Sequence, residues 1–114
     1  MRTHTEECLL PYSQTQLFTL VADVESYPEF LPWCLGARIL EINTTGFDAE
    51  LVIGFKLVRE SFKSRVILNQ SSDIEIVYLD GPFKSLKNSW SFIKTDKEDE
   101  SKIYFFLEFE FKSS

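Results

Sequence analysis

The hydrophobic residues of this chain follow a helical period first and a strand period afterwards. Between Ser13 and Val24 apolar side chains recur every three or four positions, which predicts an amphipathic helix, and Ser13 with Gln16 has the spacing of a capping box at its start. After Gly36 the period falls to two, which is typical of strands with one apolar face. The alternation predicts strands over residues 3–10, 37–44, 47–55, 57–68, 74–79, 86–95 and 102–112. Short turns between these strands predict an antiparallel meander and the α+β class.

The most apolar short segment, Ser26-Tyr27-Pro28-Glu29-Phe30-Leu31-Pro32-Trp33, lies between the helix and the second strand. Ser26 and Glu29 have capping-box spacing, and Pro28 fits a first helical turn, whereas Pro32 disfavours the helical conformation at the residue before it. A helix of about one turn is not stable by itself in water, so its aromatic residues must be buried against the sheet. We expect this segment to form the mouth of an apolar cavity. The alternative is a connection that fills the core and binds no ligand.

The predicted helix is too short to cover the predicted sheet. A sheet of seven strands is about 30 Å across, and a helix of about twelve residues is about 18 Å long. The last strand places several apolar residues on one face, namely Phe105, Leu107, Phe109 and Phe111, and neighbouring strands add further aromatic residues. We therefore expect an open groove lined by aromatic side chains, which a ligand, a partner or self-association through the uncovered face must cover.

Composition narrows the class of partner. The 114 residues suffice for one core, and 15% of them are aromatic. A net charge of −6 and a pI near 4.8 disfavour nucleic acid, because phosphate binding needs clustered Lys and Arg. Cys8 and Cys34 are expected to be reduced, and no apolar run reaches the length of a membrane-spanning helix. No signal peptide precedes the first strand, so the simplest inference is a cytosolic bacterial protein.

Signs of catalysis are weak in the sequence. His4 is the one histidine and lies near the terminus, where we expect a solvated side chain rather than a general base. A solvated outer face is indicated by strand acids that lie opposite the apolar faces, namely Asp48, Glu50, Glu108 and Glu110. Neither a glycine loop for phosphate nor the ligand spacing of a metal site occurs in the sequence. We therefore predict that the protein is not an enzyme.

Three longer stretches carry a family resemblance. They are Asp23-Val24-Glu25-Ser26-Tyr27-Pro28-Glu29-Phe30-Leu31-Pro32-Trp33-Cys34, Arg59-Glu60-Ser61-Phe62-Lys63-Ser64-Arg65-Val66 and Asp80-Gly81-Pro82-Phe83-Lys84-Ser85-Leu86-Lys87-Asn88-Ser89-Trp90-Ser91-Phe92. They resemble the coenzyme Q-binding START-like proteins of the polyketide cyclase/dehydrase and lipid-transport group. The resemblance covers essentially the whole chain and implies a helix-grip fold, in which a curved antiparallel sheet surrounds a C-terminal helix with an apolar cavity between them. That helix has no counterpart here, so we expect residues 1–114 to form one START-like domain, truncated at its C-terminus.

The resemblance also implies a function. Members of the family bind ubiquinone and support respiration, and close bacterial relatives are described as ribosome-association toxins that bind the large subunit. We expect this chain to carry ubiquinone (coenzyme Q) or a similar isoprenoid lipid, with no other cofactor, in the bacterial cytoplasm and in transient contact with the inner membrane. The alternatives are a protein directed to the large ribosomal subunit and a cyclase-like enzyme. The residues expected to contact the ligand are Tyr27, Phe30, Leu31, Trp33, Phe55, Phe62, Trp90, Phe92, Phe105 and Phe109.

Overall fold

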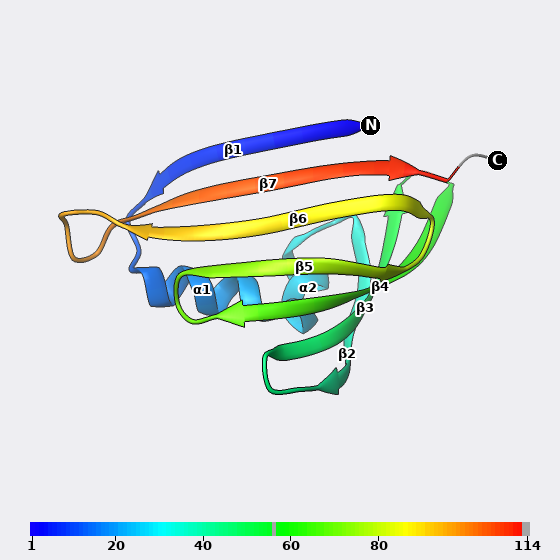
Figure 1. Cartoon of the computed structure of the whole chain (residues 1–114), viewed down its shortest axis with the longest axis horizontal. Helices are drawn as coiled ribbons and strands as arrows, with labels where there is room; N and C mark the ends of the chain where they lie inside the picture. The colour runs from blue at the N-terminus through cyan, green and yellow to red at the C-terminus, as the bar shows by residue number, and fades with distance from the viewer. Residues whose placement is uncertain (56, 113–114) are drawn as a thin grey trace.

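One antiparallel sheet of seven strands forms the body of the molecule in the computed structural model. The structure describes residues 1–55 and 57–112, without the side chains of residues 55 and 58. The strands are β1 (Arg2–Leu10), β2 (Cys34–Ile42), β3 (Gly46–Phe55), β4 (Val58–Asn69), β5 (Asp73–Asp80), β6 (Phe83–Lys94) and β7 (Ser101–Phe111). Their spatial order is β1-β7-β6-β5-β4-β3-β2, so that β1 joins the sheet beside β7 (Figure 1). The predicted α+β class and the meander of neighbouring strands are confirmed.

Two helices, α1 (Gln14–Ala22) and α2 (Tyr27–Phe30), lie between β1 and β2, separated by a 3₁₀ turn, η1 (Val24–Ser26). The capping box predicted for α1 is present. The N–H of Gln16 donates to Oγ of Ser13 (3.1 Å), and the N–H of Ser13 donates to Oε1 of Gln16 (2.8 Å). Neither of the two described helices has the length and apolar character needed to cross a bilayer.

The second capping box, predicted for α2, is wrong. Ser26 has φ −88° and ψ −7°, which is helical backbone rather than the extended conformation of a capping residue, and its Oγ donates to Oδ2 of Asp23 (2.6 Å). The segment is instead fixed by Tyr27, whose phenol donates a hydrogen bond to the carbonyl of Val21 in α1. Leu31 is extended, at φ −108° and ψ 105°, so α2 has four residues and matches the single turn that was predicted.

Two strands begin earlier than their alternation predicts. β2 starts at Cys34 because the N–H of Gly54 donates to the carbonyl of Trp33 (2.9 Å), which pairs the chain with β3 directly after the short helix. β6 starts at Phe83, where the backbone N–H donates to the phenol oxygen of Tyr78 (3.0 Å). In both places a turn, rather than the hydrophobic pattern, sets the first residue of the strand.

The core lies between the helices and one part of the concave face of the sheet. α1 packs on β5 and β6, while η1 and α2 pack on β2. Gln14 fixes α1 to the sheet by donating from Nε2 to the carbonyl of Phe92 (2.7 Å), and the rings of Phe18 and Phe92 meet edge to face with centroids 6.0 Å apart. The buried residues of this core are Leu17, Phe18, Val21, Val24, Cys34, Phe47, Ala49, Leu51, Val66, Ile74 and Phe92.

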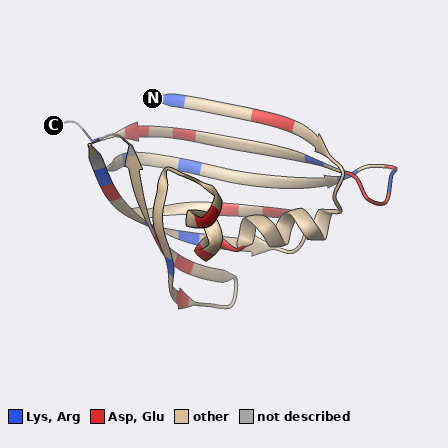
Figure 2. Ribbon diagram, turned by 180° about the vertical axis from the view of Figure 1, so that it is seen from behind, with Lys and Arg blue, Asp and Glu red and all other residues tan. Residues whose placement is uncertain are grey.

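Charged residues are distributed along the strands (Figure 2), and two pairs join neighbouring strands on the convex face. Arg65 donates from Nε and Nη2 to the two carboxylate oxygens of Asp48 (2.9 and 3.1 Å). Those hydrogen bonds, together with the charge of the guanidinium, hold the pKa of Asp48 below its ordinary value. Arg38 also pairs with Glu50, and its Nε and Nη2 lie 3.0 and 2.9 Å from the same oxygen, Oε1. These strand acids therefore lie away from the apolar face, as the alternation predicted.

Candidate functional site

An apolar cavity of about 590 Å³ lies on the concave face of the sheet. Its wall is formed by η1, the segment after α2, the edge strand β1 and strands β3 to β7. The lining residues are Glu6, Glu7, Cys8, Val24, Leu31, Trp33, Leu51, Ile53, Phe62, Ser64, Val66, Ile76, Phe83, Leu86, Asn88, Trp90, Ile103, Phe105 and Leu107. Most of them are aliphatic or aromatic, and a cavity of this size with few polar groups suits a small apolar ligand.

Half of the residues expected to contact the ligand lie in the wall of this cavity. They are Leu31, Trp33, Phe62, Trp90 and Phe105. Trp33 follows α2 and is 47% exposed, which places it at the opening rather than in the interior. Trp90 and Phe105 stand opposite each other in the β6–β7 register and so form one continuous aromatic surface.

Four of the other five expected residues do not line this cavity. Tyr27 and Phe30 contact each other edge to face within α2, with centroids 5.9 Å apart. Phe92 is 2% exposed and fills the core beneath α1, because the apolar face of β6 continues past the end of the cavity. Phe109 packs on Phe83 in a neighbouring aromatic cluster. The side chain of the remaining residue, at position 55, lies outside the described part of the chain.

Phe83 is the main wall residue that the sequence reasoning missed. Its ring closes one end of the cavity at the centre of an aromatic cluster, with centroid distances of 4.9 to 5.9 Å to the rings of Phe62, Tyr78, Phe109 and Phe111. The turn before it explains this position. Gly81 has φ +151°, and a Cβ there would lie 2.6 Å from Cβ of Phe62. The Asp80-Gly81-Pro82 sequence was the available signal, because a tight turn fixes the direction of the next side chain.

Polar groups of the wall fall into a rim and an interior. At the rim, exposed Glu6 pairs with His4 and exposed Glu7 pairs with Lys102, each at 2.9 Å. The interior contains neutral polar groups, Ser64, which is 3% exposed, and the half-buried Asn88. A neutral interior with charges at its opening is suited to binding a molecule that is mostly apolar.

Two ionisable side chains that do not line the cavity have raised pKa values. Burial raises the pKa of the Tyr27 phenol, with smaller contributions from Cys34 and Asp23, and burial also raises the pKa of the Cys34 thiol. Both groups therefore stay protonated at neutral pH and are poor nucleophiles. Residues 1–55 and 57–112 contain no cluster of three His, Cys, Asp or Glu residues that could hold a metal ion.

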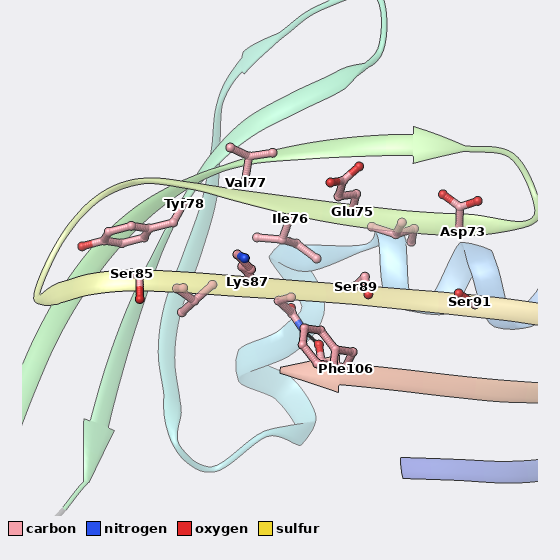
Figure 3. Close-up of a pocket in the computed structure, with 13 residues that line it drawn as sticks. Asp73, Glu75, Ile76, Val77, Tyr78, Ser85, Lys87, Ser89, Ser91 and Phe106 are labelled. Atoms are coloured by element: carbon pink, nitrogen blue, oxygen red, sulfur yellow. Dashed lines mark hydrogen bonds between the residues drawn. The ribbon is translucent and has the colours of Figure 1, made fainter. Parts of the chain in front are cut away.

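A second hollow of about 630 Å³ follows the seam between β5 and β6 (Figure 3). Asp73 and Glu75 line it from β5, and Lys87 and Ser89 line it from β6. Its wall is more polar than that of the concave cavity and more open to solvent. The two hollows share three lining residues, Ile76, Leu86 and Asn88. The concave cavity is the better candidate site, because an apolar ligand gains most from enclosure by apolar side chains.

Comparison with solved structures defines the fold. The chain superimposes on a START superfamily protein from Mycobacterium smegmatis with a TM-score of 0.86, over 97% of this chain and 78% of that one, at 19% sequence identity. The sheet and the helices inserted after its first strand therefore have the START-like helix-grip fold, which confirms the expectation from sequence.

The chain belongs to the polyketide cyclase / dehydrase and lipid transport family, whose model matches residues 10–114. It is 44% identical over 115 residues to the ribosome association toxin RatA of Rickettsia prowazekii, across 96% of this chain and 75% of that protein. It is 36% identical over 107 residues to the mitochondrial coenzyme Q-binding protein COQ10 of Dictyostelium discoideum, across 91% of this chain and 52% of that protein. The chain thus spans three quarters of the first relative and about half of the second.

Proposed function

We propose that this protein binds ubiquinone or a similar isoprenoid lipid in the concave cavity and carries it without a catalytic step. The observation that carries this proposal is the cavity itself, about 590 Å³ in volume and walled by aromatic residues such as Trp33, Trp90 and Phe105. A quinone ring can stack on aromatic side chains, and an isoprenoid tail gains from burial among aliphatic ones. The relative named as a coenzyme Q-binding protein supports the same assignment.

A carrier must take up and release its lipid at a membrane. Apolar side chains are exposed around the opening of the cavity, with Phe30 51%, Trp33 47% and Leu35 48% accessible to solvent. Trp and apolar residues partition into the interfacial region of a bilayer, so this surface suits transient contact with the inner membrane. In this proposal the carrier works in the bacterial cytoplasm, where it would serve respiration and ubiquinone biosynthesis as a chaperone of the lipid.

Mass spectrometry of lipids extracted from natively purified protein tests this function. From a host that makes ubiquinone, wild-type protein should retain it, and Trp90→Ala should retain much less because an aromatic wall is lost. Ile93→Ala is the matched control, since Ile93 lies in the same strand, is 48% exposed and does not line the cavity. Wild-type protein that neither retains ubiquinone nor binds added ubiquinone would overturn the proposal.

The second candidate function is association with the large ribosomal subunit. The 44% identity to a ribosome association toxin favours it. The net charge of −6 argues against it, because a surface that meets ribosomal RNA needs clustered positive charge. Co-sedimentation with large subunits separates the two functions. Contacts to phosphate should weaken steeply as the screening length falls from about 10 Å at 0.1 M salt to about 3 Å at 1 M, whereas binding of ubiquinone to an apolar cavity should barely change.

A further inference from the structure

Asn88 differs from the acidic residues of the cavity wall. Its neighbours on the same face of β6 are Leu86 and Trp90, and all three line the cavity. The acidic residues of the rim, by contrast, stand on the edge strand β1 and already have side-chain partners, His4 for Glu6 and Lys102 for Glu7. An amide in the middle of an apolar wall is costly unless its polar atoms find hydrogen-bond partners.

The orientation of this amide is fixed by chemistry. Nδ2 of Asn88 donates to the backbone carbonyl of Phe106 in β7, at 2.8 Å. A carbonyl oxygen can only accept, so the nitrogen must face it and Oδ1 must point in another direction. The amide forms no other hydrogen bond with the residues that the structure describes. One acceptor and one N–H therefore have no partner among the described residues, in a side chain that lines both the concave cavity and the β5–β6 hollow.

We propose that Asn88 is the polar anchor of the cavity and selects isoprenoid ligands that carry an oxygen on their head group. This inference rests on the proposed function and deepens it, because it says which part of the ligand lies against the middle of β6. The head group lies beside Asn88 with Trp90 along its ring, and the tail extends over the aliphatic part of the wall. An amide is both donor and acceptor, so Asn88 binds a ring carbonyl through its free N–H and a ring hydroxyl through Oδ1. The site therefore holds the quinone and the quinol forms alike.

The preference for oxygen-bearing ligands follows from what a bound ligand does to the half-buried amide of Asn88. A ligand without oxygen covers the free polar atoms of Asn88 and gives them no partner, whereas a ligand with a carbonyl or hydroxyl restores the hydrogen bond lost from water. One neutral hydrogen bond of this kind corresponds to roughly a 3- to 10-fold difference in Kd. Replacement of the amide by a similar apolar side chain should remove the preference and leave the apolar contacts in place.

Displacement of Nile red from the intact chain tests the inference, with three competing ligands. Farnesol and farnesene have related tails and differ in the hydroxyl group, and ubiquinone-2 carries the quinone ring. In Asn88→Leu, farnesol and ubiquinone-2 should bind roughly 3- to 10-fold more weakly, while farnesene should bind as well as before or better. Lys87→Leu is the matched control, because its side chain lies on the opposite face of β6 and should alter none of the three affinities. If Asn88→Leu does not fold, Asn88→Ser, which shortens the side chain, should give the same selective loss.

The outcomes separate this inference from the function on which it rests. Equal weakening of all three ligands, or no change in any, would overturn the role of Asn88 even if wild-type protein binds ubiquinone-2. A preference for farnesol over farnesene that Asn88→Leu abolishes supports the anchor, and it does so even if wild-type protein fails to bind ubiquinone-2. In that last case the proposed quinone function fails, but the role of Asn88 in binding oxygen-bearing isoprenoids is supported.

Discussion

The indole of Trp90 meets the ring of Phe105 edge to face, with ring centroids 4.6 Å apart and an interplanar angle of 65°. The two residues are partners in the β6–β7 ladder, and both line the cavity. The protein has one other tryptophan, Trp33, which stands at the opening of the same cavity. Every indole of the chain therefore reports on the candidate site.

Intrinsic fluorescence should consequently follow ligand binding. Ubiquinone-2 should quench both Trp33→Phe and Trp90→Phe, because each variant keeps one indole in the cavity wall and a quinone ring accepts excitation energy at short range. The two titrations should give similar midpoints, since they measure one binding event. Trp33→Phe retains only Trp90, and Trp90→Phe retains only Trp33. If one variant is not quenched, the quinone ring lies away from the indole that this variant retains, which would contradict a ligand that spans from the opening to the β6–β7 surface.

Trp33→Ala should weaken ligand binding more than it lowers stability. Truncation of a fully buried tryptophan typically costs about 3–5 kcal/mol of unfolding free energy, and Trp33 is 47% exposed, so its loss should lie well below that range. Urea denaturation and ligand titration on the same preparation measure the two effects. A loss of stability within that range, with unchanged affinity, would show that Trp33 belongs to the core.

Phe92 and Phe105 should behave in opposite ways. Phe92→Ala should lower the free energy of unfolding by about 3–5 kcal/mol, because the residue is 2% exposed and packs under Phe18. Phe105→Ala removes part of the cavity wall and should lower affinity for ubiquinone-2 with a smaller loss of stability. Chemical denaturation measures the free energy of unfolding, and dye displacement measures the affinity for ubiquinone-2. If Phe92→Ala instead proves stable and defective in binding, the cavity extends beneath α1.

Ser13 and Ser26 form a matched pair for helix capping. Ser13→Ala should cost about 1 kcal/mol, because Oγ of Ser13 accepts from the N–H of Gln16 at the start of α1. Ser26→Ala should cost clearly less, since Oγ of Ser26 caps no helix and contacts an exposed carboxylate. Chemical denaturation of the two variants makes the comparison, and equal losses would contradict the backbone geometry of Ser26.

Gly81 and Gly36 form a second pair. Gly81→Ala should destabilise the protein by about 1–3 kcal/mol, because the residue has φ +151° and its Cβ would meet Cβ of Phe62 at 2.6 Å. It should also weaken ligand binding, since the turn places Phe83 in the end wall. Gly36→Ala should change stability little, as the nearest atom to its Cβ would be 3.8 Å away. A thermal melt of Gly81→Ala that matches wild type would show that the turn relaxes without strain.

The fold follows from local patterns that the sequence states directly. Strict alternation shows which strand residues share a face, and the short turns leave few topologies other than a meander. The two capping predictions show the limit of such patterns. Ser13 and Ser26 both have the residue three positions on that a capping box needs, but only Ser13 has extended backbone, because the 3₁₀ turn before α2 holds Ser26 in a helical conformation.

The site was harder to predict because its extent depends on what covers each part of the sheet. Alternation places Trp90 and Phe92 on the same face of β6, but α1 covers Phe92 and leaves Trp90 at the cavity. Phe83 lies outside the strand that alternation predicted and is placed by the turn at Gly81. Asn88 is a polar residue on the face of β6 where the alternation otherwise places apolar residues. This departure from the pattern was the signal in the sequence for a polar group in the cavity wall.

The short β5–β6 ladder gives the sheet a line of weakness. This ladder has five residue pairs and ends at Val77 and Lys87, whereas the β6–β7 ladder has eleven. Fewer backbone hydrogen bonds must break to part the sheet there than at β6–β7. The β5–β6 ladder thus divides the one sheet into two groups of strands, β1-β7-β6 and β5-β4-β3-β2. A lipid too long for the concave cavity would therefore gain room first between β5 and β6, beside Ile76 and Leu86, which line both hollows.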